Sequence, residues 1–214
     1  IPDVNMEAGL KELSAFEKNF DIRTLKMATE AEIAGLVIDS PGITKHGEDS
    51  WNSLAERMAE HGVGKIFHVM GTEGIEGMCN AFRLLNETEA FVQLIFPHKR
   101  NFSKYELALA GSCVSICITG GPIKANYLDL IKPLREGKDT KSRQLLETLE
   151  SFMLDAGLST AVTAKLMDIH ANTVQYRLKR IKDALGVDIT GTSIVPGLMM
   201  SLAVSRVEKE VRSF

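Results

Sequence analysis

Amide, hydroxyl and basic side chains gather in one short stretch between residues 171 and 182. Asn172, Thr173 and Gln175 come first, and cations follow at positions 177, 179, 180 and 182. Asn and Gln can form paired hydrogen bonds with adenine in the major groove, whereas Arg and Lys bind phosphate groups. The first turns of a recognition helix meet base edges, and later cations meet the DNA backbone. The stretch therefore has the residue types that DNA recognition requires, in the required order.

We expect seven side chains to contact double-stranded DNA: Asn172, Thr173, Gln175, Tyr176, Arg177, Lys179 and Arg180. Asn172 and Gln175 are the candidate base contacts, and Thr173 can touch a base or a phosphate. Tyr176 and Arg177 have an alternative role, which is to brace the first helix of the motif, the one that begins near Ser159. His170 precedes the stretch and is expected to cap the helix or pack against it rather than to contact bases.

Two helices around a tight turn must position these side chains. Val174, Leu178, Ile181 and Leu185 follow one another at steps of four, three and four, which places them on one buried stripe of the second helix. The stripe leaves the polar residues on the opposite face. The spacing predicts a helix-turn-helix, although an ordinary helical hairpin with a solvated basic face has the same pattern.

The first helix of the pair is short. Ser159 or Thr160 is its expected N-cap, and Val162, Ala164 and Leu166 are its expected buried residues. The turn comprises residues 168–170, and Asp168 is expected to adopt the left-handed conformation, which Asp tolerates better than most residues.

The run from Leu145 to Ile189 resembles the C-terminal domain of the PucR/CdaR-type bacterial transcription regulators. The family signature HxNTxxYRLxRIxxxxGxD is matched in spacing from His170 to Asp188. The resemblance implies an all-α helix-turn-helix domain that binds promoter DNA. Family members commonly have Arg directly after the signature His, and this chain has Ala171. The loss of that cation leaves more of the base contact to Asn172, Thr173 and Gln175.

Charge supports DNA binding only locally. Residues 165–182 hold five cations and one acidic residue, whereas the first 140 residues hold fifteen cations and twenty acidic residues, and the whole chain has a net charge of −3. Such a chain is not a general polyanion binder. It needs a small, directed basic surface, and we expect a homodimer to double that surface.

Composition indicates a globular protein without a membrane span. Apolar residues make up 44% of the chain, but none of the apolar runs reaches the roughly 18 residues that a membrane helix needs. We expect no signal peptide, since the first residues lack a basic start followed by an apolar core. The odd, low number of cysteines, three, favours reduced thiols and a cytoplasmic location. Cys113 and Cys117 are expected to be buried thiols. We expect neither a metal site nor a cofactor.

The first 120 residues alternate between helical and strand-like patterns. Helices are expected over 6–20, 51–60, 75–85 and 104–117, and strands over 33–38, 63–70 and 90–96. This order predicts an α/β module with a sheet of three or more strands, loosely similar to the end of a GAF-type ligand domain. We expect the module over 1–120, a linker with a short helix over 121–140 and the DNA-binding domain over 141–214. The module would sense a small-molecule effector or mediate dimerisation.

Two other functions stay open from the sequence. The helical hairpin could dock a protein partner, or residues 1–120 could hold an unrecognised enzyme site. Neither a catalytic triad nor a pair of catalytic carboxylates is visible. The glycine-rich run from Gly62 to Gly77 lacks the Lys-Ser or Lys-Thr end of a phosphate loop and the spacing of a dinucleotide site. We therefore expect a regulator rather than an enzyme.

Overall fold

The computed structural model describes residues 6–20, 23–28, 33–38, 41–69, 74–137 and 139–211. The chain forms two compact units. An N-terminal unit comprises residues 1–70 with 99–103, and a C-terminal unit comprises residues 71–98 with 104–214. The domain limits expected at residues 120 and 140 stay a prediction.

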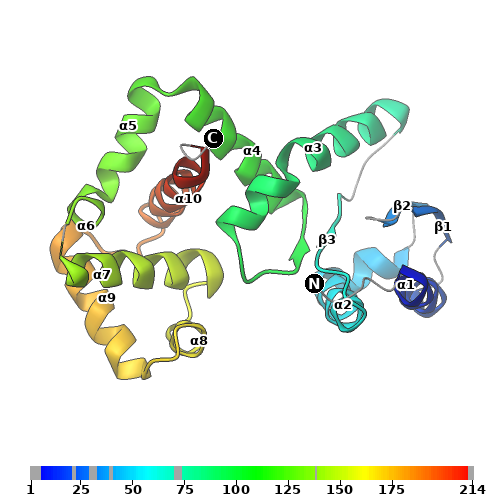
Figure 1. Ribbon diagram of the computed structural model, residues 1–214, viewed down its shortest axis with the longest axis horizontal. Helices are drawn as coiled ribbons and strands as arrows, with labels where there is room; N and C mark the ends of the chain where they lie inside the picture. The colour runs from blue at the N-terminus through cyan, green and yellow to red at the C-terminus, as the bar shows by residue number, and fades with distance from the viewer. Residues whose placement is uncertain are drawn as a thin grey trace. The chain divides into compact units, whose positions relative to one another are not determined.

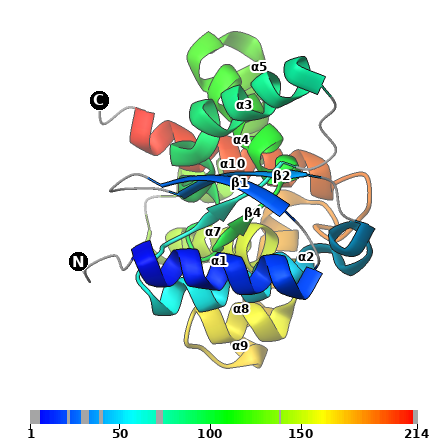
Figure 2. The same cartoon turned by 90° about the vertical axis from the view of Figure 1, so that its right-hand side faces the viewer.

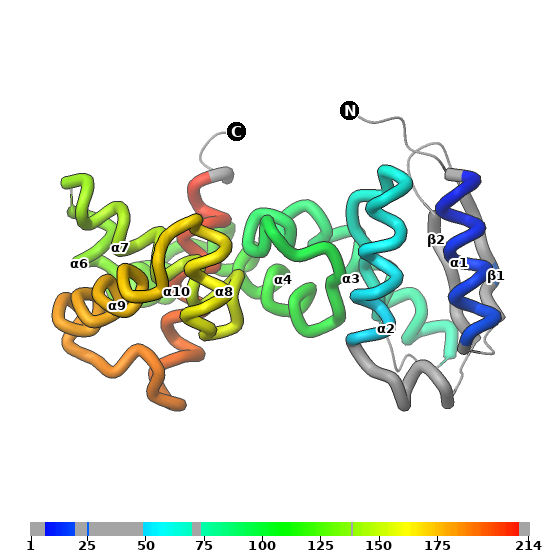
Figure 3. The backbone as a smooth tube through the Cα atoms, turned by 90° about the horizontal axis from the view of Figure 1, so that it is seen from below, coloured from blue at the N-terminus to red at the C-terminus, as the bar shows by residue number. Residues whose placement is uncertain are grey.

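The N-terminal unit is built on a helix pair, α1 (Met6–Phe20) and α2 (Pro41–Glu60). The two helices lie alongside each other (Figures 2 and 3). Phe16 of α1 packs against Trp51, Leu54 and Met58 of α2, all of them buried. Trp51 also stacks on His68, with 4.6 Å between the ring centroids. Helix α2 starts ten residues earlier than expected, and Pro41 is its first residue, a position that suits the fixed φ of proline.

The described strands of this unit form two separate pairs. Strands β1 (Arg23–Ala28) and β2 (Ile33–Ile38) form an antiparallel pair, with Arg23 opposite Ile38 and Ala28 opposite Ile33. Strands β3 (Ile66–Phe67) and β4 (Asn101–Phe102) form a short parallel pair. The expected strand over 33–38 is confirmed. Among the described residues, however, none of the pairings is wider than two strands, so the expected α/β module with a three-stranded or larger, GAF-like sheet is wrong.

The main error concerns residues 90–96, which are helical as far as Ile95. They form the last turns of α3 (Gly74–Ile95), whose buried residues Thr88, Val92 and Ile95 are separated by four and three positions. That spacing gives one helical face, so the apolar run is the end of an amphipathic helix rather than a buried strand. The helix ends directly before Phe96 and Pro97, because the residue before a proline is disfavoured in the α conformation.

In the described residues of the C-terminal unit, all the regular elements are helices. Its first part comprises α3, α4 (Lys104–Thr119), α5 (Gly121–Leu130) and α6 (Lys132–Arg135). Helices α3 and α4 pack against each other, and Gly111 of α4 lies where a Cβ would be 3.4 Å from the Thr88 methyl group. The last helix, α10 (Val195–Val211), packs on α3, α4 and α5 (Figure 1).

Helix α10 is buried on every side along its middle. Residues 201–205, 207 and 208 are at most 3% exposed, and the side chain of Arg206 is 13% exposed. A helix that is surrounded in this way forms the centre of a unit rather than its surface. The apolar residues of this segment therefore pack inside the protein, mainly against helices that precede the helix-turn-helix.

The two cysteines of α4 face α10. The Cys113 thiol lies 3.5 Å from the Met200 sulfur, and the Cys117 thiol lies 3.7 Å from the Val204 carbonyl oxygen. Both thiols are free and buried, as expected, whereas Cys79 is exposed. Burial, with a smaller effect of Cys117, raises the pKa of Cys113 to about 12.

Replacement of Leu202 by Ala should lower the free energy of unfolding by about 2–5 kcal/mol, because it leaves a cavity inside the packed centre. Ile118→Ala is the matched control, since Ile118 is 76% exposed, and it should change stability by no more than about 0.5 kcal/mol. Urea unfolding measures both. Equal effects of the two substitutions would contradict the central position of α10.

The three thiols should also differ in reactivity. In the folded protein a disulfide reagent should modify Cys79 quickly, while Cys113 and Cys117 should react only after unfolding, because burial disfavours the thiolate. Timed labelling followed by mass spectrometry measures this order. Fast labelling of Cys113 under native conditions would show that α4 does not pack on α10.

Candidate nucleic-acid interface

Two helices lead into the candidate DNA-contacting helix, and the first of them changes its winding before it ends. Helix α7 (Thr140–Glu150) passes directly into a π-helical turn, η1 (Ser151–Asp155). The Ala156 N–H donates to the Ser151 carbonyl at 2.8 Å, which is the wider π spacing. Gly157 and Leu158 then both adopt positive φ, 56° and 64°, so the chain turns sharply before the next helix.

Helix α8 (Thr160–Leu166) is the first helix of the motif, and Ser159 is its N-cap. The Val162 N–H donates to the Ser159 hydroxyl oxygen at 3.3 Å. The expected burial of Ala164 is confirmed, but that of Val162 and Leu166 is wrong, since they are 44% and 38% exposed. Thr163 is buried instead. Its hydroxyl donates to the Ser159 carbonyl at 2.8 Å, so burial leaves this polar atom with a hydrogen-bond partner.

The turn between the helices follows the expected geometry. Asp168 has φ 52°, the left-handed conformation predicted for it. His170 is the N-cap of the next helix, and its Nδ1 accepts a hydrogen bond from the Asn172 N–H at 3.1 Å. The expected capping role of His170 is confirmed.

Helix α9 (Ala171–Leu185) presents the candidate side chains. Val174 and Ile181 are fully buried, while Leu178 and Leu185 are half-buried, so the predicted apolar stripe holds the helix on the unit. The helix packs on α7 and α8. Gly186 is its C-cap, with a φ of 69°. Glycine adopts this left-handed conformation without strain.

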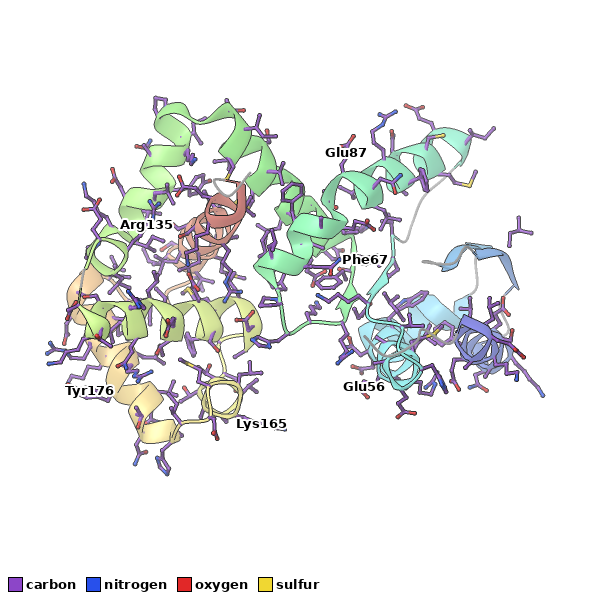
Figure 4. The ribbon with its side chains drawn as sticks, viewed as in Figure 1. Glu56, Phe67, Glu87, Arg135, Lys165 and Tyr176 are labelled. Atoms are coloured by element: carbon purple, nitrogen blue, oxygen red, sulfur yellow. The ribbon has the colours of Figure 1, made fainter. Side chains whose placement is uncertain are left out.

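Six of the seven predicted residues are exposed on α9: Asn172, Thr173, Gln175, Tyr176, Lys179 and Arg180. Figure 4 shows the labelled side chains of Tyr176 on α9 and Lys165 on α8, both exposed. The helix therefore presents amides and a hydroxyl in its first turns and cations in its third. That is the arrangement a major-groove helix needs.

Arg177 differs from the other six because it is half-buried and turned towards α7. Its guanidinium donates to the Thr148 hydroxyl oxygen at 3.2 Å and to the Gln144 side-chain oxygen at 3.3 Å. This geometry is that of a brace between helices, but the braced helix is α7 and not the first helix of the motif, α8, as predicted. Sequence reasoning missed the two partners, although Gln144 and Thr148 are four residues apart and so share one face of α7.

Lys182 is engaged with a neighbouring carboxylate. Its Nζ lies 2.9 Å from Oδ1 of Asp188, which also accepts from the Thr190 hydroxyl at 2.8 Å. The hydrogen bond from Lys182, followed by those from Thr190, lowers the pKa of Asp188 to about 2. The carboxylate stays charged above that pH and offsets part of the positive charge of Lys182.

Other kinds of site have little support in the described part of the chain. There, no group of three or more His, Cys, Asp or Glu side chains could hold a metal ion. A shallow hollow of about 300 Å³ lies between α3 and α4, bordered by Thr88, Val114 and Ile118. Taken singly, the described helices are too short or too polar to cross a membrane; α4 and α5 meet the criterion only as a pair, and that pair is bent by 117°.

Comparison with known proteins finds several that are similar to this chain or to part of it. Over 68 residues the chain is 41% identical to uncharacterized protein Rv2242 of Mycobacterium tuberculosis and uncharacterized protein Mb2266 of Mycobacterium bovis. The aligned segment covers 32% of this chain and spans only 15% of each relative. The crystal structure of a regulator of polyketide synthase expression from Bifidobacterium adolescentis aligns with 96% of this chain and 77% of its own chain, at 18% identity and a TM-score of 0.35. At that TM-score the likeness supports no statement about the fold.

The family comparison is more specific. The model of the PucR C-terminal helix-turn-helix domain matches residues 145–204, which run from α7 through α9 to the middle of α10. The match includes every predicted DNA-contacting residue and confirms the family resemblance of the signature. Residues 145–204 of this chain therefore form a PucR-type C-terminal helix-turn-helix domain.

Proposed function

We propose that this protein is a sequence-specific DNA-binding transcriptional regulator of the PucR/CdaR type. It acts as a homodimer in the bacterial cytoplasm, and a small-molecule effector or a partner controls it through the N-terminal part of the chain. It has no enzymatic activity of its own. The observation that supports the proposal most directly is the exposed polar face of α9, with amides first and cations later.

The packing of α9 supports major-groove binding. Val174 and Ile181 fix one side of the helix in the unit, and Arg177 ties it to α7, so the opposite side is held in one orientation. A fixed orientation lets Asn172 and Gln175 select bases instead of only attracting phosphate. One such helix offers few phosphate contacts, and a symmetric dimer on two half-sites would double them.

One observation favours a second function, the docking of a protein partner. Val162 and Leu166 lie four residues apart on α8 and are both exposed, so they form a small apolar face on the motif. The two functions differ in what the cations of α9 do. In a docking hairpin Lys179 and Arg180 are solvated and take no part in DNA binding.

A selection of bound genomic fragments with the intact protein tests the proposal. A regulator enriches a small set of fragments that share a sequence, and its affinity falls steeply as salt rises, because phosphate contacts release counterions. Recovery of fragments without a shared sequence would overturn the proposal and leave docking as the better function.

Asn172→Ala and Gln175→Ala should each weaken binding to the selected site by about 1–3 kcal/mol while leaving binding to unrelated DNA nearly unchanged, because they remove base contacts. Lys179→Ala should instead weaken both by a similar factor. Titration at several salt concentrations measures the differences, with Lys104→Ala, an exposed cation of α4, as the control. Equal losses on both kinds of DNA for Asn172→Ala would remove its base-contacting role.

Arg177→Met keeps the length of the side chain but removes both hydrogen bonds to α7, and it should lower the free energy of unfolding by about 1 kcal/mol. Arg180→Met is the matched control on the same helix. It should cost less than about 0.5 kcal/mol, since Arg180 is exposed. Thermal unfolding compares the two. A stability loss confined to Arg180→Met would show that Arg177 does not brace α9.

A further inference from the structure

We propose that Arg206 is a positioning residue for DNA binding, which holds the π-turn that leads into the helix-turn-helix and ties it to the end of α3. The inference rests on the proposed function. It assigns a role to a residue of α10 that has no place in the DNA-contacting face.

The guanidinium of Arg206 joins three separate elements. It donates two hydrogen bonds to the carboxylate of Asp155, at 3.0 and 2.8 Å, and Asp155 is the last residue of the π-turn. Its Nε lies 3.5 Å from the Glu150 carboxylate at the end of α7. It also donates to the carbonyl oxygen of Ile95, the last residue of α3. We call these four residues the Arg206 cluster.

The charged side chains of the cluster are buried, so few arrangements of them are energetically acceptable. The side chains of Arg206, Glu150 and Asp155 are 13%, 10% and 3% exposed. A charge taken out of water must find ionic and hydrogen-bonding partners, because an unpaired one is strongly unfavourable. Burial acts to lower the pKa of Arg206, but the hydrogen bond and charge of Asp155, with the charge of Glu150, outweigh it and the pKa is raised.

The position of Asp155 determines where α8 begins. Only residues 156–158 separate Asp155 from Ser159, the N-cap of α8, and two of them are held at positive φ. The Leu158 N–H also donates back to the Phe152 carbonyl at 2.8 Å, which closes the turn. Helix α8 packs on both η1 and α9. A shift of Asp155 would therefore move α8 and, with it, the exposed face of α9.

The hydrogen bond from Arg206 to the Ile95 carbonyl connects the cluster to a second region, the end of α3. Helix α3 lies outside the matched helix-turn-helix segment, yet its final carbonyl is bound by the same guanidinium that holds the π-turn. One side chain thus links the DNA-binding domain to the upstream helices. A lysine at this position keeps the charge but has no planar fork, so it cannot bind Asp155 through two parallel bonds and reach Ile95 as well.

The test compares Arg206→Lys with Arg135→Lys in the intact chain. Arg135, labelled in Figure 4, also binds a buried carboxylate of α10, that of Glu208, but it does not contact the π-turn. The two substitutions are chemically identical. Binding to the selected site and to unrelated DNA is measured at a temperature where both variants are fully folded, together with amide hydrogen exchange.

Arg206→Lys should weaken binding to the selected site by about tenfold, the size of one lost base contact, with less than about a twofold change on unrelated DNA. The amides of Ala156 and Leu158 should exchange faster, because the π-turn opens locally, whereas Arg135→Lys should leave both measurements near wild type. Asp155→Asn should reproduce the exchange and binding changes, and the double variant should add little.

Three results would overturn the role of Arg206. The first is unchanged site binding by a folded Arg206→Lys protein; the second is an equal loss in Arg135→Lys, which would indicate general loosening of α10. The third is unchanged exchange at Ala156 and Leu158. If the wild-type protein selects no site, the proposed function fails and the positioning role falls with it. The exchange result then shows separately whether the π-turn depends on Arg206.

Discussion

The C-terminal unit depends on one constraint, which is that α10 is buried on all sides between residues 201 and 208. A helix in this position must receive neighbours from several directions, and here they come from α3, α4, α5 and the π-turn. Two of the buried residues are charged, Arg206 and Glu208, and both are satisfied by partners from other elements. The apolar packing gives the unit its cohesion, whereas the charged pairs fix which element lies where, because a buried charge tolerates few arrangements.

Helix α9 of the helix-turn-helix differs from α10 in burial, because most of its side chains are exposed or half-buried. Its apolar anchoring is narrow, with Val174 and Ile181 of α9 fully buried, and this leaves most of the helix surface to solvent. Two hydrogen-bonding residues complete the support: Arg177 donates to side chains of α7, and His170 accepts from the first turn of α9. Since those two polar residues are used for support, the exposed residues between and beyond them are free to meet a ligand. Support and contact are thus assigned to different residues of the same short helix.

The sequence predicted the motif well because its signals are local. The stripe from Val174 to Leu185, the left-handed Asp168 and the capping His170 each depend on neighbours within a few residues. The prediction of an N-terminal sheet was wrong for the same reason. The run over 90–96 is apolar enough for a strand, and only the spacing of its buried residues from Thr88 shows that it continues a helix. Thr148 lies 29 residues from Arg177 and Asp155 lies 51 residues from Arg206, and the periodicity of one helix contains nothing about the side chains of another.

The position of α10 also bears on how far the matched helix-turn-helix segment can fold as an independent domain. The helix closes the matched segment in sequence, yet most of its packing surface is supplied by α3, α4 and α5. A fragment cut ahead of α7 would carry α10 without those neighbours and would expose a broad apolar surface to water, the usual cause of aggregation. A recombinant protein that joins such a domain to a different upstream domain therefore needs other helices that cover the apolar surface of α10. The surface of α10, more than the exposed polar face of α9, would decide which upstream domains are compatible.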